Sequence, residues 1–118
     1  MIYFMSKLDE IILLADIIES IEKIKEYTHN LTLEDFLSDT KTKDAVVKNF
    51  EIMGEVVARM NTDFKTQHSK VIWKDLKDFR KILIHAYEII DYALVWDTIL
   101  NELPQVYKEA KDLLRTLQ

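Results

Sequence analysis

The chain contains a single glycine and a single proline among its 118 residues, and this scarcity limits its fold more than any other feature. The tight turns of β-hairpins favour glycine and proline, so this sequence is poorly suited to forming an antiparallel β-sheet. Apolar residues make up 48% of the chain and recur three and four positions apart, the spacing of one helix face. We therefore predict an all-α fold: a compact up-and-down bundle of four to five helices, in a single domain that covers residues 1–118.

Two capping boxes mark helix starts in the first third of the chain. Ser6 and Asp9 have the spacing of such a box, and so do Thr32 and Asp35. The first box predicts a long helix whose apolar stripe comprises Leu14, Ile17, Ile18, Ile21, Ile24 and Tyr27. The second box predicts a short capped turn that buries two neighbouring apolar residues, Phe36 and Leu37.

Three further helices are expected in the rest of the chain. The first runs from about 42 to 60; its interior Gly54 costs about 1 kcal/mol relative to Ala and suggests close approach of another helix. Residues 61–70 are polar and predict a loop, after which Val71-Ile72-Trp73 returns to the core. The second helix runs from about 76 to 90. The third begins near 91 and is expected to kink at Pro104. Its apolar stripe comprises Trp96, Ile99, Leu100, Leu103, Val106, Ala110, Leu113, Leu114 and Leu117.

The charge and the lack of cysteine exclude several classes of protein. A net charge of −5 lacks the basic footprint of a stable nucleic-acid binder, so contact with RNA is expected to be local or shared with a second subunit. Without cysteine the chain has no disulfide and no thiolate metal site, which fits a cytoplasmic location. The apolar run 11–15 is too short to span a membrane, and no signal peptide is evident.

The segment Arg80-Lys81-Ile82-Leu83-Ile84-His85-Ala86-Tyr87 carries the strongest chemical signal. Arg can hold a phosphate and His transfers protons near neutral pH, so the pair suggests phosphodiester chemistry. On an ideal helix Arg80 and Tyr87 lie about 20° apart, whereas His85 lies about 140° from Arg80. Either the long Arg bends around, or two copies of the helix face each other and share the site. Ile84, which is apolar and off the core stripe, favours the second arrangement, a two-fold dimer.

Other interpretations of these residues remain open. Lys81 precedes His85 by one turn, and its charge would favour the neutral imidazole that acts as a general base. Alternatively, Arg80 pairs with a carboxylate such as Asp78 or Glu55, and the histidine is simply half-buried. A helical protein that only dimerises would also fit.

The sequence offers little support for a metal or a bound cofactor. His29 and His68 lie in predicted polar loops far from His85, without the spacing of a metal site. One glycine cannot form a glycine-rich phosphate loop. We therefore expect neither a metal nor a resident cofactor.

The chain resembles the HepT-like toxins, a branch of the HEPN (higher eukaryotes and prokaryotes nucleotide-binding) superfamily. The hallmark of that family is Arg, four residues, His, one residue and Tyr, which here is Arg80, His85 and Tyr87. The resemblance covers nearly the whole chain, through landmarks on both sides of the hallmark: Tyr27-Thr28, Leu33-Glu34-Asp35-Phe36-Leu37, Asp44-Ala45-Val46, Ile52-Met53-Gly54-Glu55, Trp73, Val95-Trp96 and Leu103-Pro104.

The resemblance implies a dimeric helical bundle in which two Arg/His motifs line one cleft. It also implies a metal-independent RNase, the toxin of a type VII-like toxin–antitoxin pair, with Arg80 and His85 as catalytic residues. The implied partner is a minimal nucleotidyltransferase antitoxin, MntA, which uses ATP to add AMP to the motif tyrosine, here Tyr87, and so silences the toxin. Lys81 stands where the family usually has Asn, and it could contact an RNA phosphate instead. A non-catalytic HEPN module that binds a nucleotidyltransferase or its substrate is the alternative.

Overall fold

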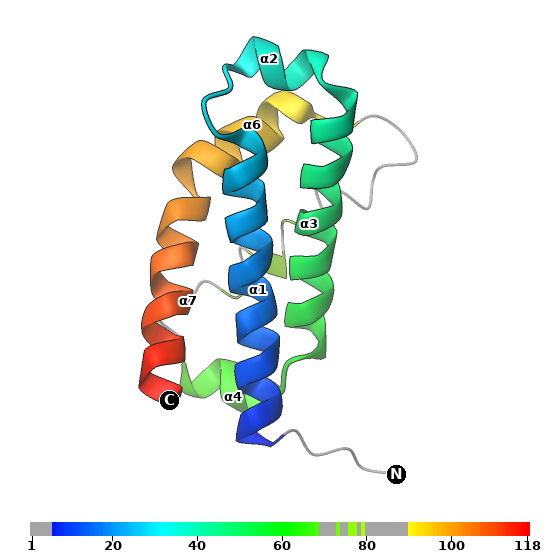
Figure 1. Cartoon of the computed structure of the whole chain (residues 1–118). Helices are drawn as coiled ribbons and strands as arrows, with labels where there is room; N and C mark the ends of the chain where they lie inside the picture. The colour runs from blue at the N-terminus through cyan, green and yellow to red at the C-terminus, as the bar shows by residue number, and fades with distance from the viewer. Residues whose placement is uncertain (1–5, 69–72, 74–75, 78, 80–89) are drawn as a thin grey trace.

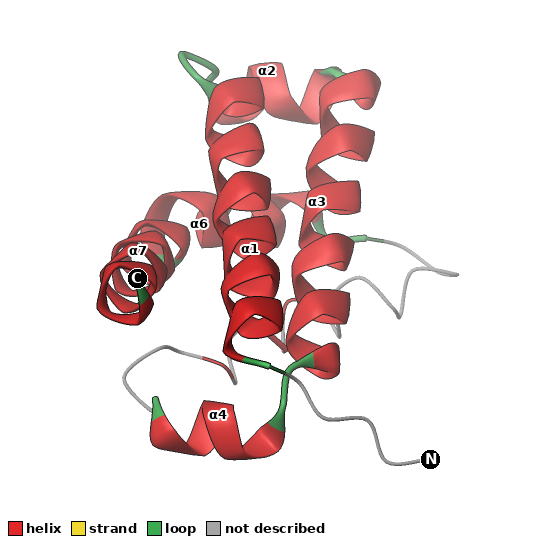
Figure 2. Cartoon of the chain, turned by 60° about the horizontal axis from the view of Figure 1, so that its bottom comes forward, coloured by secondary structure: helices red, strands yellow, loops and turns green. Residues whose placement is uncertain are grey.

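Two long antiparallel helices, α1 (Lys7–Thr28) and α3 (Thr40–Arg59), lie side by side and form the centre of the molecule (Figure 1). Helix α7 (Leu103–Leu117) packs along another side of α1 and runs antiparallel to it. Short helices cross the two ends of this group. Helix α2 (Leu33–Ser38) joins α1 to α3 at one end, and α4 (Thr62–Gln67) follows α3 at the other (Figures 1 and 2).

The remaining helix is α6 (Tyr92–Asn101), which packs against α2 and leads into α7. The computed structural model describes residues 6–68, 73, 76–77, 79 and 90–118. Within these residues the regular elements are all helices, which confirms the prediction of an all-α bundle. None of the helices described there is long and apolar enough to cross a membrane.

Both predicted capping boxes are present. The Ser6 hydroxyl accepts a hydrogen bond from the Asp9 amide at 3.1 Å, and the Asp9 carboxylate accepts one from the Ser6 amide at 3.1 Å. Thr32 and Asp35 repeat this exchange at the start of α2. Each box pairs backbone N–H groups that a helix start otherwise leaves without partners. The sequence therefore located these two helix starts correctly.

Helix α3 begins two residues earlier than expected, because Asp39 caps it. The Asp39 carboxylate accepts hydrogen bonds from the Thr42 amide at 3.1 Å and from the Thr42 hydroxyl at 2.7 Å. These bonds favour the charged carboxylate and hold the pKa of Asp39 below its usual range. The glycine expected to mark a close helix approach, Gly54, is buried within α3.

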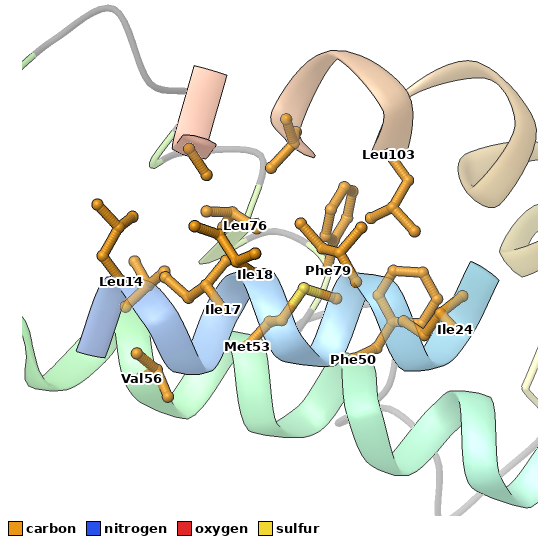
Figure 3. Close-up of a cluster of buried hydrophobic side chains, with 14 of the residues drawn as sticks. Leu14, Ile17, Ile18, Ile24, Phe50, Met53, Val56, Leu76, Phe79 and Leu103 are labelled. Carbon is orange, nitrogen blue, oxygen red and sulfur yellow. The ribbon is translucent and has the colours of Figure 1, made fainter. Parts of the chain in front are cut away.

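The core lies between α1, α3, α7 and the residues around position 76. From α1 it takes the predicted stripe residues Leu14, Ile17, Ile18, Ile21 and Ile24. Figure 3 shows several of these facing Phe50, Met53 and Val56 of α3, with Leu76 and Phe79 beside them. The rings of Phe50 and Phe79 meet edge to face with centroids 5.3 Å apart, a favourable geometry for two aromatic rings.

Three residues expected in the core are instead exposed: Tyr27, Leu37 and Leu100. At the end of α1 the inward position belongs to Thr28, whose hydroxyl donates to the Ile24 carbonyl at 2.8 Å. In α2, Phe36 takes the inward position, and the residue that follows it points about 100° away. Leu100 follows the buried Ile99 in the same manner.

The polar stretch after α3 is a helix rather than a loop. Asn61 caps α4 by accepting a hydrogen bond from the Asp63 amide at 2.8 Å. The single apolar side chain of α4, Phe64, is buried, and Lys65 donates from Nζ to the Val57 carbonyl near the end of α3 at 3.2 Å. A helix of six residues with one buried side chain is too short to produce a recognisable stripe.

The C-terminal region forms two helices rather than one kinked helix. They meet at Glu102, which ends α6 and begins α7, and the chain changes direction there (Figure 1). Pro104 lies in the first turn of α7, where its missing N–H leaves no helical hydrogen bond unmade. Proline therefore starts a new helix at this point.

Candidate functional site

The motif residues Arg80, Lys81, His85 and Tyr87 lie outside the described residues, as does Ile84. The structure instead describes the residues that flank the motif on both sides. These are Trp73, Leu76, Lys77 and Phe79 before it, and Ile90 after it.

Trp73 is anchored to the end of α4. Its indole N–H lies 3.1 Å from the Lys65 carbonyl and 3.0 Å from the His68 carbonyl and donates to both. Both acceptors belong to the C-terminal end of α4, where carbonyls lack partners within the helix. The indole ring also packs near the buried Phe64, with centroids 6.0 Å apart. This tryptophan therefore closes α4 and holds the chain against it, seven positions before Arg80.

Two further side chains that precede Arg80 are buried in the core. Leu76 and Phe79 are buried, and both lie in the cluster formed with α1 and α3 (Figure 3). Together with the half-buried Trp73 they recur at intervals of three, as expected for one helix face. Arg80 is thus covalently next to an anchored core residue.

The chain is fixed again directly after the motif. Ile90 is half-buried against the core, and Asp91 caps α6 by accepting a hydrogen bond from the Leu94 amide at 3.1 Å. The hallmark segment is therefore connected at each end to a packed part of the bundle.

We expect Trp73→Phe to lower the free energy of unfolding by about 1–2 kcal/mol, because it leaves two carbonyls at the end of α4 without their donor. Chemical denaturation followed by circular dichroism measures this. Trp96→Phe is a matched control, since Trp96 packs on Phe36 with centroids 5.1 Å apart and loses the same ring area. Equal losses in the two variants would mean that the indole N–H contributes nothing.

Burial raises the pKa of Glu10 in the first turn of α1; the charge of His68 opposes this rise and that of Asp9 adds to it. His68 ends α4 rather than lying in a loop, and its ring centroid is 4.6 Å from that of Phe64. The exposed His29 ends α1. Among the described residues no group of His, Asp and Glu side chains is arranged to hold a metal.

Of the two carboxylates considered as partners of Arg80, Glu55 is exposed on α3, and Asp78 lies outside the described residues. The hypothesis of a simple ion pair therefore stays a prediction.

Comparison with known families gives the decisive observation. The sequence profile of the family described as Ribonuclease HepT-like matches residues 17–113, a span that includes the whole motif segment. The chain belongs to this family. The predicted family membership is thereby confirmed.

Individual relatives agree with this assignment to the HepT-like family. The "Probable ribonuclease HepT" of Thermococcus cleftensis is 40% identical over 93 residues, which cover 79% of this chain and 84% of that protein. A provisionally named RNase of Methanocaldococcus jannaschii is 34% identical over 114 residues, which cover 97% of this chain and 94% of the relative. No solved structure matches the chain.

The sequence did not reveal the anchoring of Trp73. Its hydrogen bonds go to backbone carbonyls of a helix that the polar composition of residues 61–70 concealed. The signal that could have revealed this helix is Asn61 followed by Asp63, a capping residue and an acidic first turn.

Proposed function

We propose that this chain is a metal-independent endoribonuclease and the toxin of a type VII-like toxin–antitoxin pair. The observation that carries the proposal is the match to the Ribonuclease HepT-like family across the segment that contains Arg80 and His85. The names of the relatives, which refer to ribonucleases, support the same chemistry. Lys81 is the feature that favours the other candidate, a non-catalytic module that binds a nucleotidyltransferase.

In the proposed reaction, His85 accepts the proton of a ribose 2′-hydroxyl. The 2′-oxygen then forms a bond to the adjacent phosphorus, and the bond from phosphorus to the 5′-oxygen of the next nucleotide breaks. That oxygen takes up a proton from water, so the products are a 2′,3′-cyclic phosphate and a 5′-hydroxyl. Arg80 stabilises the negative charge that develops on the phosphorane-like transition state, and Lys81 contacts a phosphate of the RNA.

The proposed site is shared between two subunits. On an ideal helix the directions of Arg80 and His85 differ by about 140°, so a second copy of the segment brings an Arg and a His together more easily than one copy does. An isologous dimer supplies both motifs to one cleft. Each chain has a net charge of −5, so the dimer helps to hold RNA only by bringing the Arg80 and Lys81 cations of both copies to one cleft.

The partner in this proposal is an MntA-like nucleotidyltransferase antitoxin. The hydroxyl oxygen of Tyr87 attacks the α-phosphate of ATP, its proton is lost, and pyrophosphate leaves. The product is a tyrosine that bears AMP. Because Tyr87 lies about 20° from Arg80 on a helix, the added phosphate can pair with Arg80 and repel RNA from the same place.

Incubation of the purified chain with single-stranded RNA in the presence of EDTA tests the ribonuclease proposal. We expect cleavage that leaves cyclic phosphate ends, because a mechanism that uses the 2′-hydroxyl needs no metal. The matched control is DNA of the same sequence, which lacks that hydroxyl and should stay intact. Cleavage of both polymers, or cleavage only with a divalent cation, would refute this mechanism. A folded chain that cleaves no RNA would favour the non-catalytic module.

A further inference from the structure

Four leucines are exposed on α2 and α6, although these two helices pack against each other. Leu33 and Leu37 of α2 are 39% and 40% exposed, and Leu94 and Leu100 of α6 are 43% and 56% exposed. The packing itself uses other residues. Phe36 of α2 lies between rings of α6, with its centroid 6.4 Å from that of Tyr92 and 5.1 Å from that of Trp96. Leu33 and Leu37 share one face of α2, whereas Leu94 and Leu100 lie about 120° apart around α6. We refer to the exposed residues of these two helices, with their four leucines, as the α2–α6 surface.

The same two segments carry an unusual charge. Residues 31–40 and 90–106 contain six carboxylates and no Lys or Arg: Glu34, Asp35, Asp39, Asp91, Asp97 and Glu102. The rest of the chain holds 15 acidic residues against 16 basic ones. The entire negative surplus of the molecule is therefore contributed by α2, α6 and the residues that cap them.

Three of these carboxylates, Asp35, Asp39 and Asp91, accept hydrogen bonds from backbone amides at helix starts. The bonds from Thr42 hold the pKa of Asp39 below its usual range. The ion pairs found among the described residues, Lys23–Glu19 and Arg115–Asp112, lie on α1 and α7. Close to α2 and α6, the ammonium of Lys43 instead lies over the ring of Tyr92, 4.6 Å from its centroid. Lys41 lies close enough to Asp39 to help lower its pKa. Within the described part of the chain none of the six carboxylates forms an ion pair, so the α2–α6 surface keeps a negative surplus.

This combination of leucines and carboxylates discriminates between possible occupants. RNA is a polyanion and is repelled by an acidic surface. A second copy of the chain, docked face to face by two-fold symmetry, would oppose six carboxylates with six more. A protein segment that carries both apolar and basic side chains is complementary in both respects, since it covers the leucines and neutralises the acids.

We propose that the α2–α6 surface binds a partner protein through a segment in which basic residues flank apolar ones. The leucines provide the contact area, and the carboxylates guide the approach and select against acidic partners. None of the residues of this surface belongs to the motif segment 80–87, so the proposal does not depend on ribonuclease activity.

A synthetic amphipathic peptide tests this proposal. It carries Leu at helical spacing and Lys elsewhere, and its binding to the full chain is followed by fluorescence anisotropy. We expect the double variant Leu33→Ser/Leu37→Ser to weaken binding by about tenfold or more, because it removes apolar side chains that the peptide would bury. The matched control is Leu8→Ser/Ile12→Ser, a second exposed pair at the same spacing, 65% and 51% exposed, at the opposite end of the bundle (Figure 1). This control should bind as the parent chain does.

A variant that removes two of the carboxylates tests the electrostatic part of the proposal independently. Glu34→Gln/Asp97→Asn should weaken peptide binding severalfold in about 0.1 M salt, and the difference should vanish in about 0.5 M salt, where charges are screened within a few Å. A peptide with Glu in place of Lys should not bind. Circular dichroism confirms that each variant is folded.

Several results would overturn the proposal. One is equal loss of binding in the two serine double variants, and another is no binding of the Lys–Leu peptide at all. Self-association of the parent chain that disappears in Leu33→Ser/Leu37→Ser would make the surface a contact between copies. An RNA that protects α2 and α6 from labelling would make it a nucleic-acid surface.

Discussion

We expect His85→Ala to lower the rate of RNA cleavage by about 10²- to 10⁴-fold, the usual effect of removing a positioned acid–base group. The rate is measured in single turnover with end-labelled RNA, and expression of the variant should no longer slow growth. Arg80→Ala should give a loss of about 10²- to 10³-fold, because it removes charge stabilisation of the transition state. Thermal unfolding curves like that of the parent chain would exclude a folding defect. Full activity in a folded His85→Ala chain would remove His85 from the mechanism.

Mixing these two inactive variants tests the shared site. A dimer that contains one Arg80→Ala chain and one His85→Ala chain keeps one intact Arg and one intact His. If the two belong to different subunits of one cleft, activity returns as the subunits exchange. If exchanged heterodimers stay inactive, each subunit carries its own complete site. A protein that remains a monomer at micromolar concentration would also exclude the shared cleft.

The second large effect concerns Tyr87. Incubation with the cognate nucleotidyltransferase and ATP should increase the mass of the chain by one or more AMP groups, the first of them on Tyr87. RNA cleavage should then fall by at least about 10²-fold, because a bulky anion occupies the place of the RNA phosphate and pairs with Arg80. Tyr87→Phe should cleave RNA at the parent rate and should escape silencing, since it lacks the acceptor oxygen.

An exposed tyrosine elsewhere in the chain offers the control for this experiment. Tyr27 lies at the end of α1 and is accessible, so Tyr27→Phe should be modified and silenced like the parent chain. If the adduct persists in Tyr87→Phe, or if an active partner adds nothing to the parent chain, the proposed regulation is wrong.

Local signals predicted much of the fold. The capping boxes at Ser6 and Thr32 were read correctly because both partners of each box lie within four residues of each other. The stripe of α1 was likewise predicted, since its leucine and isoleucine residues follow a helical period and face one common core. For these features the spacing of residues in the sequence and the packing of the helices favour the same helix starts and the same buried face.

The residues wrongly predicted to be buried lie near the ends of helices, or in a helix whose inward face is set by a change of chain direction. Tyr27 and Leu37 are apolar residues at the margins of short or terminating helices, so their neighbours Thr28 and Phe36 take the inward positions. Leu100 was assigned to a stripe drawn through one continuous helix, whereas the turn at Glu102 gives α6 its own inward face. That face includes Val95 and Thr98. Periodicity alone does not reveal where a helix changes direction.

In the candidate site, too, some features could be predicted from the sequence and others could not. The motif from Arg80 to Tyr87 and the family could be inferred from sequence, because both rest on residue identity and spacing. The attachment of Trp73 to the Lys65 and His68 carbonyls could not be inferred, because it joins a side chain to the backbone of another element. The same holds for the contact between Phe79 and Phe50, which are 29 positions apart in the chain.

Asp39 and Glu102 each belong to two helices at once, the first ending α2 and capping α3, the second ending α6 and beginning α7. No spacer residue separates the helices of either pair, so one extra residue at such a joint would rotate the following helix by about 100°. In α7 that rotation would carry Val106, Ala110 and Leu113 out of the core. The turn at 29–32 differs, because it has several residues and already accommodates Asn30 in the left-handed region at φ 60°. Unlike the joints at Asp39 and Glu102, this turn can therefore change in length without turning a helix out of register.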